Sequence, residues 1–211
     1  MKKIGITQRQ LYFKKYGETR DMIDRRLVDW VISAGFMPVP IPNNLVQIPS
    51  SDSSKFLLEK WITNIGFDGF LFSGGGDPGD DTVRDLTENF LIEFSQKNSI
   101  PILGICRGMQ VLGMRDGSAL EVISGHANSI HDISFTIKGS VARSKTVNSY
   151  HNFGFKTCPK SYNVVAISDD GCIEAMRHKF HNWEGWMWHP ERERQFEEFD
   201  LENFRNLINN D

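Results

Sequence analysis

The chain has 211 residues with 24 basic and 27 acidic side chains, which gives a formal net charge of −3. This length suits one α/β domain with a sizeable core. The charges are nearly balanced and form no run of Lys or Arg, which argues against a nucleic-acid or membrane-surface partner. No apolar stretch approaches the ~18 residues that cross a bilayer. The N-terminal segment lacks an apolar signal core, and three cysteines are a poor basis for a disulfide framework. We therefore expect a single cytoplasmic domain over residues 1–211.

The first half of the chain alternates strand-like and helix-like segments. Apolar residues that recur every three or four positions predict helices, and short apolar runs that end in turn residues predict strands. The predicted elements are a strand over 3–7, a polar and aromatic loop over 8–19, a helix over 20–34, a strand over 37–41, a helix over 53–64, a strand over 67–72, a helix over 80–97, and a strand from 100 to Cys106 followed by a helix. In the helix over 53–64, the spacing favours a buried face of Phe56, Leu57, Trp61 and Ile62. Repeated β-α units predict an open, mostly parallel sheet with helices on both faces.

The second half of the chain is richer in short strands. Strands are predicted over 135–137, 144–147, 164–168 and 173–176, an apolar run over 186–188 leads to His189, and a helix is predicted over 199–208. These strands predict a small antiparallel extension of the parallel sheet. No repeat, low-complexity tract or linker divides the chain.

The segment around Cys106 carries the strongest functional signal. Cys106 stands between Gly104 and Gly108, at a predicted junction of strand and helix. Flanking glycines let the backbone turn sharply and keep bulk away, as in a nucleophile elbow. The following helix directs its amide N–H groups and positive dipole end toward the sulfur, which favours the thiolate. The pattern predicts a reactive Cys106, whereas Cys158 and Cys172 are expected to have structural roles.

A nucleophilic thiol needs a base, and the base needs an orienting partner. Among six histidines, His189 is the best candidate because it follows an apolar run and precedes Glu191 by two residues. In an extended segment, residues i and i+2 point to the same side, so Glu191 can hydrogen-bond the imidazole. The role of His151 stays open at this point. The other four are expected to be surface or hydrogen-bonded histidines: His126, His131, His178 and His181.

An acyl-transfer site also needs N–H donors for a tetrahedral oxyanion. Arg107 follows the nucleophile at the predicted helix N-terminus. The glycine turn over 74–76 follows a predicted strand, where α/β sheets place their sites, and it can bring main chain close to a substrate. No metal or cofactor is expected. One set of residues has types that bind zinc but lacks the close cysteine pair of a zinc site: Cys158, Cys172, His178 and His181.

These motifs together resemble the γ-glutamyl hydrolase branch of the class I glutamine amidotransferase superfamily. The resemblance rests on the run over 104–110, the glycine turn before it, and His189-Pro190-Glu191. Segments 5–9, 34–42 and 147–152 also resemble the branch and occur in its order. The resemblance covers nearly the whole chain, and it implies a flavodoxin-like α/β fold that hydrolyses a γ-glutamyl amide through a thioester.

The resemblance also implies roles for individual residues. Cys106 would be the nucleophile, His189 the general base and acid, and Glu191 the orienting carboxylate. The N–H groups of Gly75 and Arg107 would form the oxyanion hole. The glutamyl moiety would be contacted by Gln110, Ser149, Tyr150 and His151. The chain departs from the branch at Gly113, which replaces a common Asn, and at Gly117-Ser118, which replaces a Gly-Gly pair. These changes lie outside the triad and bear on the substrate rather than on the chemistry.

The amine that leaves is the open question. The loop over 9–16 mixes cations with aromatic rings, so it can stack on a base and meet a phosphate, or it can be solvated with no such role. The whole chain also resembles hydrolases that release glutamate from a nucleotide-linked phosphoramide in bacterial capsule phosphoramidate synthesis. A γ-glutamyl-γ-aminobutyrate-type hydrolase, a glutaminase subunit that supplies a synthetase partner, and a non-catalytic γ-glutamyl binder are alternatives. The expected partner is a small γ-glutamyl molecule, and the sequence permits a homodimer.

Overall fold

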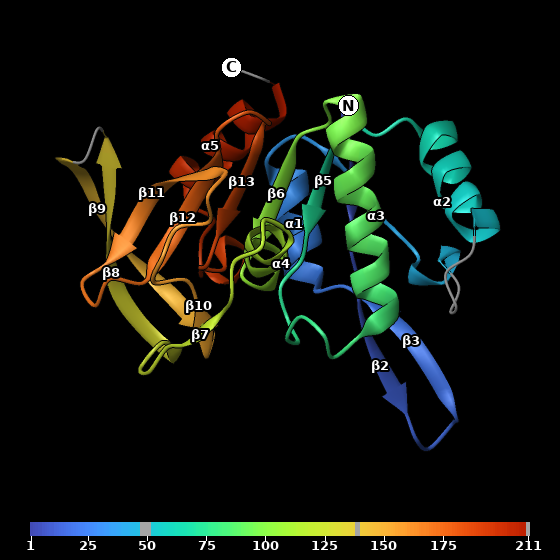
Figure 1. Cartoon of the computed structure of the whole chain (residues 1–211), viewed down its shortest axis with the longest axis horizontal. Helices are drawn as coiled ribbons and strands as arrows, with labels where there is room; N and C mark the ends of the chain where they lie inside the picture. The colour runs from blue at the N-terminus through green and yellow to red at the C-terminus, as the bar shows by residue number, and fades with distance from the viewer. Residues whose placement is uncertain (47–51, 138–139, 210–211) are drawn as a thin grey trace.

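The computed structural model describes residues 1–46, 52–137 and 140–209. Within them, one nine-stranded sheet forms the centre of the molecule (Figure 1). Its order is β4 (Met37–Pro40), β1 (Lys3–Ile6), β5 (Gly69–Phe72), β6 (Ile102–Ile105), β13 (Trp183–Trp186), β12 (Ile173–His178), β11 (Tyr162–Ser168), β8 (Ala127–Ile137) and β9 (Ser140–Tyr150). Strands β4 to β13 pair in parallel, and β13 to β9 pair antiparallel. The predicted open α/β sheet with an antiparallel extension is therefore confirmed.

Helices cover both faces of the parallel half. One face carries α1 (Arg25–Ser33) and α5 (Glu198–Asn209), whose Trp30 and Phe204 rings stack at 4.8 Å within the core on that side. The other face carries α2 (Asp52–Ile65), α3 (Thr82–Asn98) and α4 (Arg107–Arg115). Along β5, Leu71 enters the first core, whereas Phe70 and Phe72 enter the second. This period of two explains why β5 is apolar at every position: both of its faces are buried.

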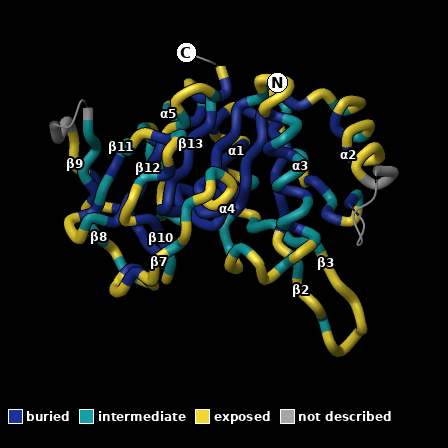
Figure 2. Tube along the Cα trace, in the orientation of Figure 1, coloured by how far each residue is buried: buried dark blue, intermediate teal, exposed yellow. Residues whose placement is uncertain are grey.

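The loop predicted over 8–19 is instead a β-hairpin. Strands β2 (Arg9–Phe13) and β3 (Glu18–Met22) pair antiparallel around a turn that contains Gly17 at φ 64°. The hairpin projects from the body and is largely exposed (Figure 2). An exposed two-stranded ribbon needs no apolar face, so its strands left no hydrophobic pattern in the sequence. Helix α1 accordingly begins later than predicted, after Asp24, whose side chain accepts the Arg26 N–H.

The predicted buried face of α2 is confirmed at Ile62 and wrong at Phe56 and Leu57, while Trp61 is partly buried against the core. Phe56 and Leu57 are 66% and 47% exposed, whereas Leu58 and Ile62 are buried. The pair at i and i+4 forms the apolar stripe that contacts the core. The predicted helix itself is present as α2, and the helices expected over 80–97 and 199–208 are present as α3 and α5.

Four short elements complete the described structure. Strands β7 (Glu121–Val122) and β10 (Phe153–Gly154) form a small antiparallel pair, and 3₁₀ helices cover η1 (Asn43–Leu45) and η2 (Pro190–Arg192). None of the helices in the described ranges combines the length and apolar character needed to cross a bilayer.

Candidate active site

Cys106 lies at the turn between β6 and α4, as the sequence predicts. Its backbone has φ 51° and ψ −105°, an unfavourable conformation for a residue with a side chain. The turn requires both flanking glycines. A Cβ on Gly108 would lie 2.3 Å from the Phe72 carbonyl oxygen, and one on Gly104 would lie 2.5 Å from the carbonyl carbon of Gly108. The strand, the strained turn and the helix therefore fix the thiol at the carboxyl edge of the parallel strands.

His189 and Glu191 form a close buried pair. The imidazole Nδ1 lies 2.6 Å from Glu191 Oε1, and both side chains are almost fully buried. Burial lowers the pKa of His189, but the negative charge of Glu191 and hydrogen bonding with Cys106 and Glu191 outweigh it and raise that pKa to about 9. Since Nδ1 is engaged by Glu191, Nε2 is the nitrogen available for proton transfer.

The local backbone at this pair differs from the extended segment that the sequence suggested. Residues 190–192 form the single 3₁₀ turn η2, with Pro190 at its first position. Proline fixes φ near −65°, which suits the start of such a turn. The turn still brings Glu191 to Nδ1, so the predicted contact is present through a different backbone path.

Asn148 of β9 holds the backbone of His189. Its Oδ1 accepts the His189 N–H at 3.0 Å, and its Nδ2 donates to the His189 carbonyl at 2.9 Å. This two-point contact joins the antiparallel half of the sheet to the imidazole. Sequence reasoning missed Asn148, although it lies in the segment 147–152 that resembled the hydrolase branch.

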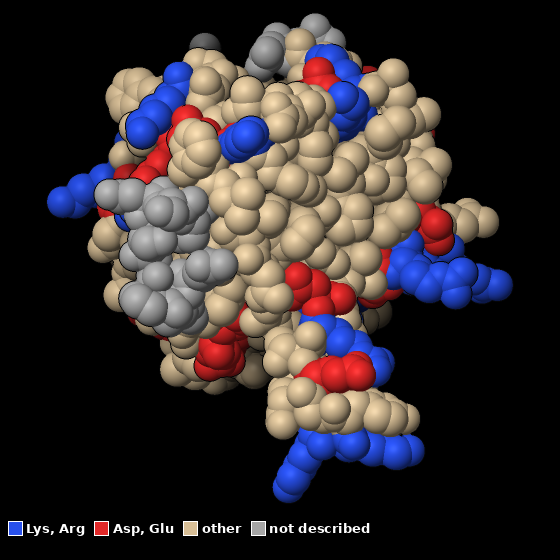
Figure 3. All heavy atoms as spheres, turned by 90° about the vertical axis from the view of Figure 1, so that its right-hand side faces the viewer, with Lys and Arg blue, Asp and Glu red and all other residues tan. Residues whose placement is uncertain are grey.

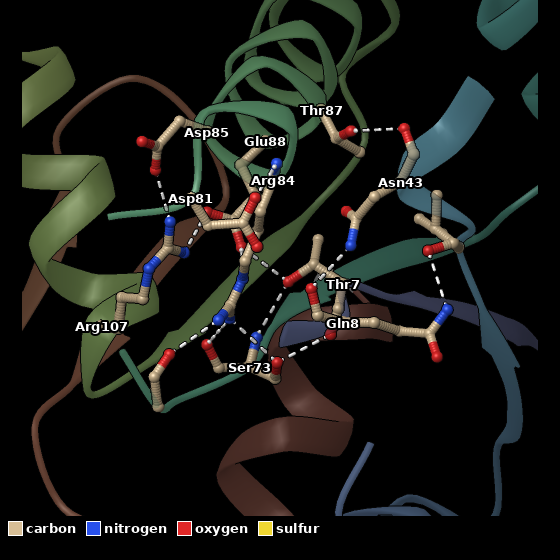
Figure 4. Close-up of polar contacts among 12 residues, drawn as sticks. Thr7, Gln8, Asn43, Ser73, Asp81, Arg84, Asp85, Thr87, Glu88 and Arg107 are labelled. Atoms are coloured by element: carbon tan, nitrogen blue, oxygen red, sulfur yellow. Dashed lines mark hydrogen bonds and ion pairs between the residues drawn. The ribbon is translucent and has the colours of Figure 1, made fainter. Parts of the chain in front are cut away.

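A buried ionic network supports the glycine turn from the side of α3 (Figure 4). Arg84 donates to the carbonyl oxygens of Ser73 and Gly75 at 2.5 and 2.7 Å. Its Nε also donates to Glu88 at 3.0 Å. The other Glu88 oxygen accepts from the side chain of Arg107, the residue after Cys106. One buried carboxylate thus links the glycine turn to the first turn of α4.

The side chain of Arg107 is therefore occupied away from any substrate. It is 1% exposed and pairs with Glu88 and with Asp85, the latter at 2.5 Å. The role expected for Arg107 concerns only its backbone N–H, and that role is compatible with this arrangement. The network itself was missed from the sequence, where an arginine and a glutamate four residues apart on α3 were the available signal.

Cys106 and His189 open into one cavity of about 290 Å³. Of the other residues predicted for the site, Gly75, Gln110, Tyr150 and His151 also line it. Glu191 lies behind the imidazole, and Ser149 is fully buried outside the lining. Two further lining residues are Asp77 and Asn152.

Two arginines flank the cavity near the glycine turn. Arg192 lines it and stacks its guanidinium on the Tyr150 ring at 4.5 Å from the ring centre. Arg9, at the base of the β2–β3 hairpin, places Nη1 3.2 Å from the position that a Cβ on Gly75 would occupy. Of these, Arg9 belonged to the segment predicted to meet a phosphate, whereas Arg192 was missed.

Residues 3–191 match the model of the Peptidase C26 family, so the chain belongs to this family. The chain is 30% identical over 196 residues to the γ-glutamyl-CDP-amidate hydrolase of Campylobacter jejuni, with 90% of each protein covered. It is 27% identical over 214 residues to the γ-glutamyl-γ-aminobutyrate hydrolase of Escherichia coli K12, with 83% of this chain and 80% of that protein covered.

The fold is similar to solved glutamine amidotransferases. A glutamine amidotransferase from Thermotoga maritima superimposes with a TM-score of 0.62 at 13% identity, over 99% of this chain and 84% of that one. A candidate GMP synthase component from Thermoplasma acidophilum gives a TM-score of 0.71 at 21% identity, over 99% and 93% of the two chains. The family and the fold expected from the sequence are both confirmed.

Proposed function

We propose that the protein is a γ-glutamyl hydrolase that uses Cys106, His189 and Glu191 as a catalytic triad. One observation carries the proposal: the strained Cys106 and the Glu191-bound His189 line the same cavity as the glycine turn. The Peptidase C26 membership supports it, as do the Campylobacter and Escherichia relatives, both named for hydrolysing γ-glutamyl amides.

In the first half of the reaction, the Cys106 thiolate attacks the γ-carbonyl carbon of the substrate. A C–S bond forms while the carbonyl π electrons move to oxygen, and the oxyanion accepts hydrogen bonds from the N–H groups of Gly75 and Arg107. Collapse of this intermediate breaks the C–N bond, and the proton on His189 Nε2 moves to the leaving nitrogen. The products are a free amine and a γ-glutamyl thioester on Cys106.

In the second half, water replaces the amine. His189 takes a proton from the water as its oxygen attacks the thioester carbon, and Glu191 stabilises the resulting imidazolium. The second tetrahedral intermediate collapses with cleavage of the C–S bond. Glutamate leaves, the thiolate–imidazolium pair returns, and no cofactor is consumed. Gln110, Ser149, Tyr150 and His151 remain the proposed contacts of the glutamyl moiety.

The leaving group that we propose is CDP-amidate, released from γ-glutamyl-CDP-amidate in capsule phosphoramidate synthesis. The Campylobacter relative supports this substrate, and so do Arg9 and Arg192 beside Gly75, because guanidinium groups pair well with phosphates. Figure 3 shows further Lys and Arg side chains on the projecting β2–β3 hairpin. A diphosphate-linked leaving group would meet Arg9 and Arg192 at the edge of the cavity.

Glutamate release from three substrates at equal concentration tests the proposal. We expect the highest kcat/KM for γ-glutamyl-CDP-amidate, and a preference for γ-glutamyl-γ-aminobutyrate would reject the nucleotide. Activity on glutamine alone would favour a glutaminase subunit, which size-exclusion chromatography of native extract would show bound to a synthetase.

The same chromatography checks whether the protein is a homodimer. The homodimer remains a prediction, as do the single domain over 1–211 and the cytoplasmic location.

A matched pair of variants tests the role of Arg9. Arg9→Ala should raise KM for γ-glutamyl-CDP-amidate about tenfold and leave KM for γ-glutamyl-γ-aminobutyrate unchanged, as expected for one lost charge-assisted contact. Arg25→Ala, at an exposed position on α1, serves as the control. An equal rise for both substrates would remove Arg9 from phosphate recognition.

A further inference from the structure

A second cluster of titratable side chains lies in the antiparallel half of the sheet, around Glu174 of β12. Glu174 is completely buried, and three histidines surround its carboxylate. His126 Nδ1 and His151 Nε2 lie 3.3 and 3.6 Å from Oε1, and His131 Nε2 lies 3.6 Å from Oε2. The proposed chemistry of the triad uses neither Glu174 nor His126 nor His131.

The sheet has a bulge at Glu174. Ala175 pairs with Ala166 and Ile173 with Ile167, so Glu174 has no opposite residue on β11. Strand β11 ends one residue later, at Ser168, and leaves room for histidines from the ends of β8 and β9. Bulges redirect side chains in this way and are common beside functional sites.

The cluster leaves buried polar atoms without hydrogen bonds. Among the described residues, neither oxygen of Glu174 and neither ring nitrogen of His131 has a hydrogen-bond partner. The ring nitrogens that face Glu174 lie at ion-pair distances without hydrogen-bond geometry. A buried carboxylate in this state is unfavourable unless a cation compensates it.

The outer nitrogens of two rings are occupied in the manner of metal-bound histidines. His151 Nδ1 donates to the Phe153 carbonyl at 3.1 Å, so Nε2 is the nitrogen that faces the cluster, where it lies within hydrogen-bond distance of His126 Nδ1 at 3.2 Å. His126 Nε2 faces Asp170 Oδ1 at 3.5 Å, while its Nδ1 faces the cluster. Histidine ligands of metals typically donate their second N–H to a backbone carbonyl or a carboxylate.

The distances between the inner atoms match one face of a tetrahedron. His126 Nδ1, His151 Nε2 and Glu174 Oε1 are separated by 3.2, 3.3 and 3.6 Å. Ligands about 2.0–2.2 Å from a tetrahedral zinc ion stand roughly 3.3–3.6 Å apart. His131 completes the set, since it, His126 and Glu174 offer ligand atoms within 4.8 Å of one another.

We propose that His126, His131, His151 and Glu174 bind one zinc ion. Three imidazoles and one carboxylate are a ligand set typical of zinc, and four protein ligands leave no open position, so the ion is structural. The sequence offered only one part of this set, the short step from His126 to His131, because His151 and Glu174 lie farther along the chain. The set with zinc-binding residue types that the sequence suggested is a different one: Cys158, Cys172, His178 and His181.

The ion would stabilise one wall of the catalytic cavity. His151 lines that cavity, and the Phe153 carbonyl accepts both His151 Nδ1–H and the amide of Gln110, the latter at 2.8 Å. A metal on Nε2 would fix the His151 ring and, through Phe153, the side chain of Gln110. Zinc would thus act as a positioning element for substrate contacts rather than as a participant in hydrolysis.

Metal content provides the test, measured in a Cys106→Ala background that removes the catalytic thiol as a competing ligand. After expression with zinc and gel filtration, mass spectrometry of the elements should find about one zinc per chain, as a single four-ligand site requires. Glu174→Gln and His126→Gln should each lower zinc retention at least tenfold against a chromophoric chelator. The matched control is the double variant His178→Gln/His181→Gln, which should keep the ion.

Two results would overturn the proposal: a chain that neither contains nor binds zinc, or zinc that survives both cluster substitutions. Should the variants fail to fold, cobalt replaces them as the readout. The Cys106→Ala chain stripped by chelator and loaded with Co²⁺ should show the strong visible absorption of a tetrahedral site, and zinc should displace it. Weak absorption of an octahedral ion, or none, would refute a four-ligand protein site.

Discussion

Two buried glutamates, one on helix α3 against the parallel half of the sheet and one on β12 in the antiparallel half, show opposite ways to bury a negative charge. Glu88, beside the parallel strands, has both oxygens hydrogen-bonded: one accepts from Thr7 and Arg84, the other from Arg107. Glu174, in the antiparallel half, is equally buried, yet it faces imidazoles that form no hydrogen bond with it. Guanidinium groups are permanently charged, so Glu88 needs no ion, whereas an imidazole nitrogen can offer a lone pair to a metal ion. The identity of the neighbours therefore distinguishes a supporting ion pair from a ligand set.

The largest expected effect separates the two regions by activity. Cys106→Ala should lower kcat/KM for glutamate release at least about 10⁴-fold, because the thioester cannot form. The thermal midpoint and the zinc content should remain unchanged, since the Glu174 cluster contains no group from the triad. Enzyme assay, circular dichroism melting and metal analysis check the three parts. Substantial residual turnover would reject Cys106 as the nucleophile.

The next effect concerns the stability of the parallel half. Glu88→Gln leaves two buried guanidinium groups without their countercharge and should lower the free energy of unfolding by about 3–5 kcal/mol. Glu93→Gln on the same helix is the matched control, because its pair with Arg115 is roughly half exposed on both sides. That loss should stay within about 1 kcal/mol. Urea unfolding measures the free energy of unfolding of both variants. Equal losses for Glu88→Gln and Glu93→Gln would show that the buried ion pairs stabilise the fold no more than the exposed one.

Glu174→Gln should behave differently from Glu88→Gln. In metal-free buffer an amide replaces the buried carboxylate, and the free energy of unfolding of each protein without the ion gives the baseline. Free zinc at 100 times its Kd should then stabilise the unsubstituted chain by about 3 kcal/mol and the variant far less. The same urea titration with and without zinc makes the comparison. An equal gain in the free energy of unfolding on adding zinc to both proteins would show that Glu174 does not bind the ion.

The smallest expected effect is a shift in the pH dependence of kcat/KM that follows from the pKa of His189. The pKa of His189 is raised from an ordinary value of 6.5 to about 9, so the protonated imidazole stabilises the fold fully below about pH 6.5. This contribution to the free energy of unfolding is lost as the pH rises through about 9. Activity that needs this proton should decline over the same alkaline range. Glu191→Gln removes the neighbouring negative charge, so the alkaline limb of kcat/KM should move to lower pH, with a loss of about tenfold at pH 8. An unmoved limb would show that Glu191 does not control this proton.

The turn at Cys106 and the contact between His189 and Glu191 could be predicted from the sequence because their signals are local. Gly104 and Gly108 bracket Cys106, and His189 precedes Glu191 by two residues, so short spacings contain the required geometry. Asn148 acts on His189 from 41 residues away, and Glu174 meets histidines that lie in or next to two other strands, β8 and β9. Such contacts depend on strand order and on a bulge, which no local pattern encodes.

The buried central strands of the fold could be predicted from the sequence, whereas the exposed hairpin could not. Central strands such as β5 are apolar on both faces and are therefore easy to recognise in the sequence. The β2–β3 hairpin is exposed on both faces and carries no such pattern, and the one-residue error at Leu58 arose because adjacent apolar residues fit two helical stripes.

Position 74 has no room for a side chain beside the His189 imidazole. A Cβ at this position would lie 2.4 Å from Cε1 of His189, so even alanine would displace the imidazole. The substitution would add one methyl group and remove no functional atom. An intact Cys–His–Glu signature is therefore insufficient evidence of catalysis in a homologue. A pseudoenzyme could arise by a gain of volume rather than by a loss of chemistry, and residue 74 is the position at which to look for it.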